Sequence, residues 1–301
     1  MDQILQVRQV SKWYNDFQAL KAVEFYVPEG IIFGLLGPNG AGKTSLIRII
    51  TNITQADQGE VLLQGKDTRQ VRKGTVGYMP EERGLYKKMK VYEQLIYFCN
   101  LRQIKNEDAH RKVMYWLEKL SIADWATKNV EELSKGMQQK IQFIATVMHE
   151  PPLLILDEPF SGLDPVNTEL IKNEIQELRQ QGTSIIFSTH RMEQVEEICD
   201  RIVLINQGEK VLDDNVAELK QKWKENLFDI AFQNEPDIAS LPMDFQLHQQ
   251  NNKVIRIQSN DRAAVSHFIA REIAAGNELT LMQEILPTLN QIFIRKVQER
   301  A

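Results

Sequence analysis

Cysteine is scarce in this sequence, and so are long hydrophobic runs. Only two cysteines, Cys99 and Cys199, occur among 301 residues, too few for a disulfide framework. The longest apolar runs, such as residues 153–156 and 185–187, fall far short of the ~20 residues that a membrane-spanning helix needs. The polar start of the chain also lacks the basic stretch and apolar core of a signal peptide. We therefore expect a cytosolic protein that does not cross a bilayer by itself.

An excess of positive charge is also lacking. The chain has 36 Lys and Arg against 41 Asp and Glu, a net charge of −5. No overall basic field is available to hold nucleic acid through its phosphates, so no nucleic-acid partner is expected. The remaining composition, 43% hydrophobic and 26% charged, is that of an ordinary globular chain. At roughly 150 residues a domain, this length predicts two domains.

The order of apolar patterns predicts the architecture. Short runs at residues 31–36, 153–156, 184–188 and 202–205 indicate strands separated by helical stretches, which favours a parallel sheet covered on both faces. Residues 91–149 have a helical period, and the turn at 206–208 predicts a hairpin. After the charged residues 220–225, three strand patterns and two helices indicate a second, smaller α/β domain of about 75 residues.

The strongest local motif is the glycine-rich segment of residues 37–44, Gly-Pro-Asn-Gly-Ala-Gly-Lys-Thr. A strand at 31–36 precedes it and a helix at 44–53 follows, so main-chain N–H groups and the positive helix end converge on an anion. Lys43 is placed to neutralise the β and γ phosphates, and the Thr44 hydroxyl to bind Mg²⁺. The alternative is a glycine-rich turn without a ligand. The expected ATP contacts in this segment are Gly37, Asn39, Gly40, Gly42, Lys43, Thr44 and Ser45.

Two acidic residues end the apolar run at 153–156. Asp157 is placed to hold Mg²⁺ through water, and Glu158 to orient or deprotonate the attacking water. The alternative is that both carboxylates are merely solvated at a strand end. Together with the phosphate loop, the pair predicts hydrolysis of a nucleoside triphosphate.

With the segment Leu-Ser-Lys-Gly-Met at 133–137, about 20 residues before these acids, the chain resembles the ATP-binding subunit of an ABC transporter over residues 1 to about 220. Four further motifs carry the resemblance: Tyr14, the segment 78–81, the segment 161–164, and His190 after Ser-Thr. The chain has Glu81 where the family usually has glutamine, Lys135 in place of glycine and Met137 in place of glutamine. Residues 78–86 and 133–140 resemble the branch of sodium and drug exporters.

The resemblance implies a role for each motif. Tyr14 would stack on adenine, Glu81 would join Thr44 and Asp157 at the metal, and His190 would act with Glu158 in catalysis. The start of the helix at Ser134 has N–H groups left free for an anion, because Met137 cannot complete a capping box. In the family that anion is the γ-phosphate on the other protomer, so Ser134 and Gly136 would bind ATP across a dimer. Asp164 would lie in the dimer's D-loop.

The implied fold is α/β. Residues 1–222 would form an ABC-type nucleotide-binding domain, which has a P-loop NTPase core with a mostly parallel sheet, an antiparallel β subdomain and a helical subdomain at about 88–150. Residues 223–301 would form a small C-terminal α/β accessory domain. The implied protein is an ATP-hydrolysing subunit that uses ATP and Mg²⁺ to power a separate membrane permease, possibly for sodium or drugs. It would work as an ATP-sandwich dimer on the cytoplasmic face of the membrane, with residues 81 to about 101 contacting the permease. The alternatives are a soluble ABC-type ATPase without a permease and a nucleotide-switched regulator.

Overall fold

A computed structural model describes residues 2–72, 74–238, 241–251 and 253–298. The chain divides into two compact units, Met1–Val216 and Ala217–Ala301. The first unit holds two sheets and the second unit a third. Among the described residues, none of the helices is both long and apolar enough to span a bilayer.

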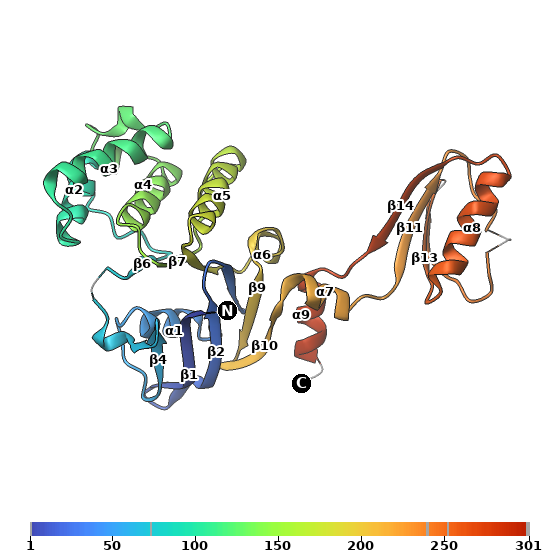
Figure 1. Cartoon of the computed structure of the whole chain (residues 1–301), viewed down its shortest axis with the longest axis horizontal. Coiled ribbons are helices and arrows are strands. Elements are labelled where there is room, and N and C mark those ends of the chain that lie inside the picture. The colour runs from blue at the N-terminus through green and yellow to red at the C-terminus, as the bar shows by residue number, and fades with distance from the viewer. Residues whose placement is uncertain (1, 73, 239–240, 252, 299–301) are drawn as a thin grey trace. The chain divides into compact units, whose positions relative to one another are not determined.

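A six-stranded sheet forms the centre of the first unit (Figure 1). Its neighbouring strands are parallel except for the final β9–β10 hairpin, which follows the predicted turn at 206–208. Every residue of the strands β3, β7 and β8 is buried, which is why these segments are continuous apolar runs. The mostly parallel sheet is confirmed. In spatial order the strands are β10 (Glu209–Asn215), β9 (Arg201–Asn206), β3 (Ile32–Leu36), β8 (Ser184–Ser188), β7 (Leu153–Asp157) and β6 (Val76–Met79).

A four-stranded antiparallel sheet lies in the same unit, as expected. Its order is β2 (Phe17–Pro28), β1 (Gln3–Tyr14), β4 (Gln58–Leu63) and β5 (Lys66–Asp67). The helix α1 (Lys43–Ile50) packs in one hydrophobic cluster with strands of both sheets. This helix ends three residues before the predicted end at 53, because Thr51 is its C-cap and Asn52 has a left-handed φ of 57°.

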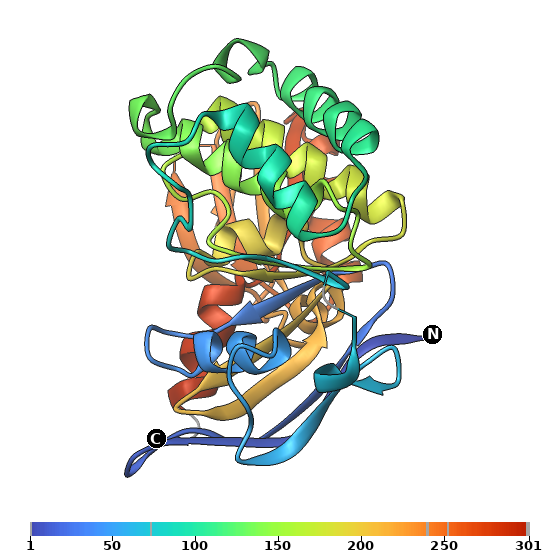
Figure 2. The same ribbon diagram turned by 90° about the vertical axis from the view of Figure 1, so that its left-hand side faces the viewer.

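Helices α2 to α5 lie on the opposite side of the parallel sheet from α1 (Figures 1 and 2). The predicted helical subdomain contains α2, α3 and α4, and α4 begins directly after Ser134, as the sequence predicts. The helices are α2 (Val91–Leu101), α3 (Asn106–Lys119), α4 (Lys135–Val147), α5 (Pro165–Gln180), α6 (Met192–Ile198) and α7 (Val216–Lys222), with short 3₁₀ turns at Thr68–Gln70, Ala123–Trp125 and Val130–Glu132.

Among its described residues the second unit has four strands, one more than the three predicted. The additional strand β12 lies at the sheet edge, and its sequence, Gln-Leu-His-Gln-Gln-Asn, lacks the apolar alternation by which strands are recognised. The helix α8 shares a hydrophobic cluster with the sheet. The elements are β11 (Leu227–Phe232), β12 (Gln246–Asn251), β13 (Val254–Gln258), α8 (Arg262–Ala274), β14 (Leu279–Ile285) and α9 (Leu289–Gln298).

Candidate nucleotide site

The glycine-rich loop joins β3 to α1, and two of its glycines are required by close backbone approaches. Gly37 has a φ of 149°, and a Cβ there would lie 2.2 Å from the carbonyl oxygen of Ile205. Gly42 has a φ of 109°, and a Cβ there would lie 2.6 Å from the carbonyl oxygen of Ala19. Gly42 is also the N-cap of α1 and provides no side-chain cap. The first-turn N–H groups of α1 are therefore available to an anion.

Lys43 lies over this loop. Its Nζ donates to the carbonyl oxygens of Gly37, at 2.7 Å, and Pro38, at 3.1 Å. Burial lowers the pKa of Lys43, and the negative charges of Asp157, Glu158 and Glu81 oppose that lowering. The loop thus holds one ammonium group beside three carboxylates.

The two acids that follow each other in the sequence have different surroundings. Asp157 is the last residue of β7 and is only 7% exposed. Burial raises its pKa, helped by the charges of Glu81 and Glu158 and opposed by the Ser188 hydroxyl and by Lys43. A carboxylate in this position is stabilised by a cation that binds next to it.

Glu158 has a left-handed φ of 51°, and its N–H donates to the carbonyl oxygen of Ser188 at 2.8 Å. Its carboxylate accepts hydrogen bonds from the His190 N–H at 2.8 Å and from the Thr189 hydroxyl at 3.1 Å. The Nδ1 of His190 lies 2.6 Å from the same carboxylate. A left-handed φ is uncommon for a residue other than glycine.

Two aromatic residues lie at the mouth of the site. Tyr14 and Phe17 flank the turn of the β1–β2 hairpin and are paired in register. They are 41% and 64% exposed and line the same hollow. Sequence reasoning identified Tyr14 but missed Phe17. Phe17 could have been identified from the sequence, because it is a second aromatic residue directly after the turn, where the next strand begins.

One open hollow, of about 900 Å³, brings most of the predicted residues together. It is lined by Tyr14, Asn39, Gly40, Gly42, Lys43, Thr44, Ser45, Glu81, Asp157, Glu158 and His190, and also by Phe17, Ala19 and Ala41. Within the described chain, no three His, Cys, Asp or Glu side chains are grouped as a metal site by themselves. A hydroxyl and a few carboxylates fit Mg²⁺, which in nucleotide sites is also held by phosphates and water.

Four predicted residues do not line this hollow. Gly37 is the first residue of the loop, and its carbonyl oxygen accepts from Lys43. Ser134 caps α4 and accepts from the Met137 N–H at 3.2 Å. A Cβ on Gly136 would lie 2.8 Å from the carbonyl oxygen of Gly162. Asp164 caps α5 and accepts from the Asn167 N–H at 2.9 Å. In the part of the chain that the structure describes, Ser134, Gly136 and Asp164 thus lie outside the lining of the hollow.

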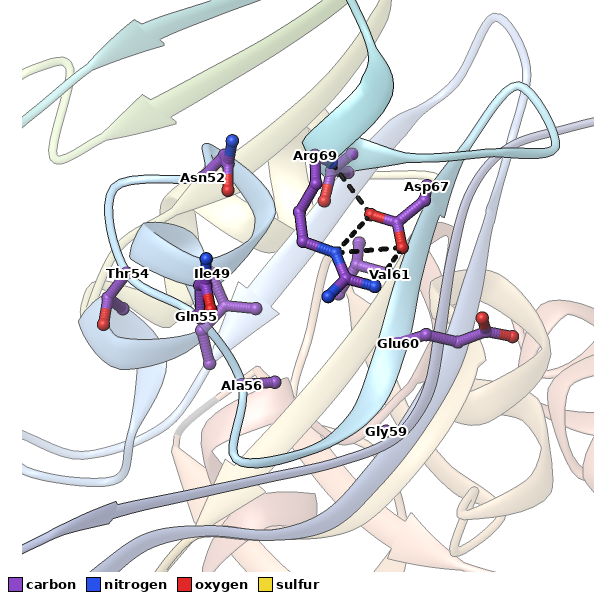
Figure 3. Close-up of a pocket in the computed structure, with 11 residues that line it drawn as sticks. Ile49, Asn52, Thr54, Gln55, Ala56, Gly59, Glu60, Val61, Asp67 and Arg69 are labelled. Carbon is purple, nitrogen blue, oxygen red and sulfur yellow. Dashed lines mark hydrogen bonds and ion pairs between the residues drawn. The ribbon is translucent and has the colours of Figure 1, made fainter.

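A second hollow lies between the end of α1 and the strands β4 and β5 (Figure 3). In this hollow the Arg69 guanidinium points toward the Asp67 carboxylate. Hydrogen bonds from the Arg69 side chain and from its backbone N–H lower the pKa of Asp67 to about 2. None of the predicted site residues lines this hollow. Its arginine, Arg69, is already paired with Asp67, so the hollow is not a candidate for the nucleotide.

Each of the two units matches a known protein family model. A family model described as "ABC transporter" matches residues 20–161, and one described as "ATP-binding protein DrrA1-3-like, C-terminal domain" matches residues 215–297. The uncharacterized ABC transporter ATP-binding protein YhaQ of Bacillus subtilis (strain 168) is 38% identical over 299 residues, with 98% of each chain covered. The daunorubicin resistance ATP-binding protein DrrA3 of Streptomyces coeruleorubidus is 27% identical, covering 100% of this chain and 99% of its own.

Solved structures resemble most of the chain. The ATP-binding subunit of an ABC transporter has a TM-score of 0.67 at 27% identity, covering 73% of this chain and 92% of its own. A nucleotide-free ATP-binding cassette from an ABC transporter has a TM-score of 0.64 at 23% identity, covering 73% and 94%. The second of these likenesses supports the fold alone.

Proposed function

The chain belongs to the family of ABC transporter ATP-binding proteins, and we propose that it hydrolyses ATP to power a separate membrane permease. Two relatives are named for resistance to linearmycin and to daunorubicin, which favours export of a drug over export of sodium. In this proposal the protein works at the cytoplasmic face of the membrane.

The observation that carries hydrolysis is the position of Glu158 beside the phosphate loop. Glu158 lines the same hollow as Lys43 and Thr44, and its carboxylate is oriented by donors from Thr189 and His190. We assign Glu158 to orient and deprotonate the attacking water, and His190 to hold the γ-phosphate. Lys43 and the N–H groups at the start of α1 bind the phosphates, while Tyr14 and Phe17 are placed for the base.

The metal part of the proposal uses Thr44, Asp157 and Glu81. Oxygen donors of this kind suit Mg²⁺, which when bound neutralises charge on the phosphates. Asp157 is the most buried of the three, and burial raises its pKa despite the Ser188 hydroxyl and Lys43, so a bound cation would favour its charged form. Glu81, in the place of the usual glutamine, adds a further negative charge to the same hollow.

A second copy completes the proposed site. Ser134 and Gly136 belong to the start of α4, whose N–H groups can bind an anion, yet neither residue lines the hollow of its own chain. We propose that they bind the γ-phosphate held by the other copy, with Asp164 at the same interface. ATP then bridges two chains, and its hydrolysis lets them separate.

The substitution Glu158→Gln tests the catalytic assignment. Because it removes the general base but keeps the shape, turnover should fall by roughly 10² to 10⁴ while ATP binding remains. Steady-state ATPase assays and calorimetric titration with ATP would measure the two effects. The matched control is Glu150→Gln, whose side chain is 73% exposed and paired with Lys112. Hydrolysis by Glu158→Gln at the parent rate would contradict the assignment.

The segment that follows Glu81 carries exposed aromatic residues suited to a permease contact. The rings of Tyr86 and Tyr97 are 5.8 Å apart, and those of Tyr86 and Phe98 are 6.2 Å apart. Tyr86 is 51% exposed and Leu101 60% exposed. An exposed aromatic cluster of this kind is typical of a protein interface.

We expect Tyr86→Glu to weaken capture of a multi-span membrane protein by the full chain from detergent-solubilised membranes, because a charge would have to be desolvated. Its basal ATPase should stay at the parent level. Tyr115→Glu is the matched control, since Tyr115 is also 51% exposed but lies on α3. An active ATPase that captures no membrane protein would favour a soluble ATPase without a permease. Nucleotide-driven dimerisation without hydrolysis would favour a regulator.

A further inference from the structure

Two buried glutamines of α4 hold the backbone of the segments that carry Glu81 and Glu158. Gln139 Nε2 donates to the carbonyl oxygens of Glu158, at 3.2 Å, and Pro159, at 2.9 Å. Gln142 Nε2 donates to the carbonyl oxygen of Pro80 at 2.8 Å. Both side chains are almost completely buried. The helix that begins at Ser134 is thus tied to both segments.

Arg83 makes a third connection, directly between those two segments. Its Nη2 donates to the carbonyl oxygen of Ser161 at 3.2 Å, across 78 residues of sequence. A Cβ on Gly162, which has a left-handed φ of 78°, would lie 3.2 Å from this nitrogen. Gly162 is also close to the start of α4, because a Cβ added to Gly136 would lie 2.8 Å from the Gly162 carbonyl oxygen. The turn at residues 161–162 is therefore held between Arg83 and the start of α4.

Each of these three side chains also buries a polar atom that has no hydrogen-bond partner among the described residues. The atoms are Arg83 Nε, Gln139 Oε1 and Gln142 Oε1. A buried donor or acceptor without a partner destabilises the folded state, and apolar side chains of similar size would avoid that cost.

We propose that Arg83 is a positioning residue that couples the two nucleotides of the dimer. Glu81 lines the hollow of the chain's own nucleotide, and Arg83 follows it by two residues. Arg83 reaches the Ser161–Gly162 turn, and that turn packs against the start of α4, which faces the other nucleotide. This inference rests on the proposed ATP-sandwich dimer. Binding of one nucleotide shifts the Glu81 segment, and Arg83 transmits the shift to the residues that bind the second.

The test compares Arg83→Gln, Arg83→Lys and the control Arg69→Gln, which removes an arginine that makes an exposed ion pair with Asp67. In Arg83→Gln we expect the Hill coefficient of the ATPase for ATP to fall toward 1 and kcat to fall about 5-fold or more, the lower end of common coupling factors. Binding of ATP to dilute single chains should be unchanged, because Arg83 does not line the hollow. Arg83→Lys keeps a donor and the charge, and should restore part of the cooperativity.

Amide hydrogen exchange gives a readout that does not depend on activity. The N–H groups of Ser161 and Leu163 donate within the turn, to Glu158 and Phe160. Their exchange should be faster in Arg83→Gln than in Arg69→Gln, while exchange in α3 should be the same. Should Arg83→Gln not bind ATP, Arg83→Lys is measured in the same way, and exchange and cooperativity equal to those of the parent would contradict the inference.

The outcomes separate the two proposals. A parent chain without ATPase activity contradicts the proposed function. An active, cooperative parent whose Arg83→Gln variant has the same Hill coefficient and the same exchange overturns the role of Arg83 alone. The role of Arg83 is also overturned if the ATPase rate of an active parent depends hyperbolically on ATP concentration, because the two nucleotides are then not coupled.

Discussion

At the residue scale, two adjacent acids are held in opposite ways. Asp157 is buried at the end of β7, where few groups favour its charge. Glu158 turns away with a φ of 51° and receives hydrogen bonds from Thr189 and His190. The left-handed φ of Glu158 thus directs its carboxylate to different surroundings from those of Asp157, so that Asp157 is suited to a cation and Glu158 to a water molecule.

The raised pKa of Asp157 predicts that its charged carboxylate, which is proposed to bind the metal, lowers the stability of the fold. Because the folded state holds this proton more tightly than the unfolded state, the free energy of unfolding decreases as pH rises from the ordinary value near 3.8 through the raised folded value. Asp157→Asn carries no such proton. Without nucleotide or Mg²⁺, the variant should unfold at a higher temperature than the parent at pH 7 and at a similar temperature at pH 3.

Thermal unfolding across this pH range would measure the difference. Asp164→Ala is the control of opposite sign, because hydrogen bonds from Asn167 lower the pKa of Asp164. Asp164 therefore stabilises the fold above its ordinary pKa, and that contribution is lost as pH falls. An Asp157→Asn variant less stable than the parent at pH 7 would show that its charge is compensated by the chain itself.

At the element scale, the start of α4 has one observed role and one proposed role, and one substitution can separate them. Ser134 caps the helix by accepting from the Met137 N–H. The same hydroxyl is proposed to bind the γ-phosphate of the other copy. An aspartate caps a helix as well as serine does, but its negative charge repels a phosphate.

Ser134→Asp should therefore keep the stability of the parent and lose ATP-driven dimerisation. Ser134→Ala should lose about 1 kcal/mol of unfolding free energy, the usual value for a missing cap. Denaturant unfolding would measure stability, and sedimentation with ATP in a Glu158→Gln background would measure dimerisation. Dimerisation of Ser134→Asp at the parent's concentration would exclude Ser134 from the phosphate site.

At the scale of the whole molecule, the chain has two units with separate hydrophobic cores. The second contains its own cluster around Phe228, Ile230 and Phe268. Its match to a C-terminal domain of DrrA-like ATP-binding proteins supports an accessory role. We propose that it supports the dimer or receives regulation from a partner, as its position after the ATPase core suggests.

A chain ending at residue 222, after α7, tests this role. We expect the kcat of its ATPase to match the full chain, since every residue lining the hollow lies in the first unit. ATP-driven dimerisation should need a higher protein concentration, because the second unit adds contacts between copies. Sedimentation equilibrium would measure the shift. Equal dimerisation and equal transport in the shortened chain would remove the proposed role.

The sequence by itself determined the local parts of this protein. The phosphate loop between β3 and α1 and the cap at Ser134 depend on residues a few positions apart, so spacing and torsional preference identify them. The fold class follows from the order of apolar runs along the chain. The polar edge strand β12 was missed because propensity is weak where apolar residues are few.

Only the tertiary structure decided which distant residues meet. Glu158 and His190 are 32 residues apart and Arg83 and Ser161 are 78 apart, yet each pair is in contact. Their contacts depend on the order of strands in the sheet, in which β3 lies between β8 and β9 and not beside its neighbours in sequence. Apolar patterning fixes which face of a strand is buried, but not which strand lies next to it, because that depends on the packing of the whole core.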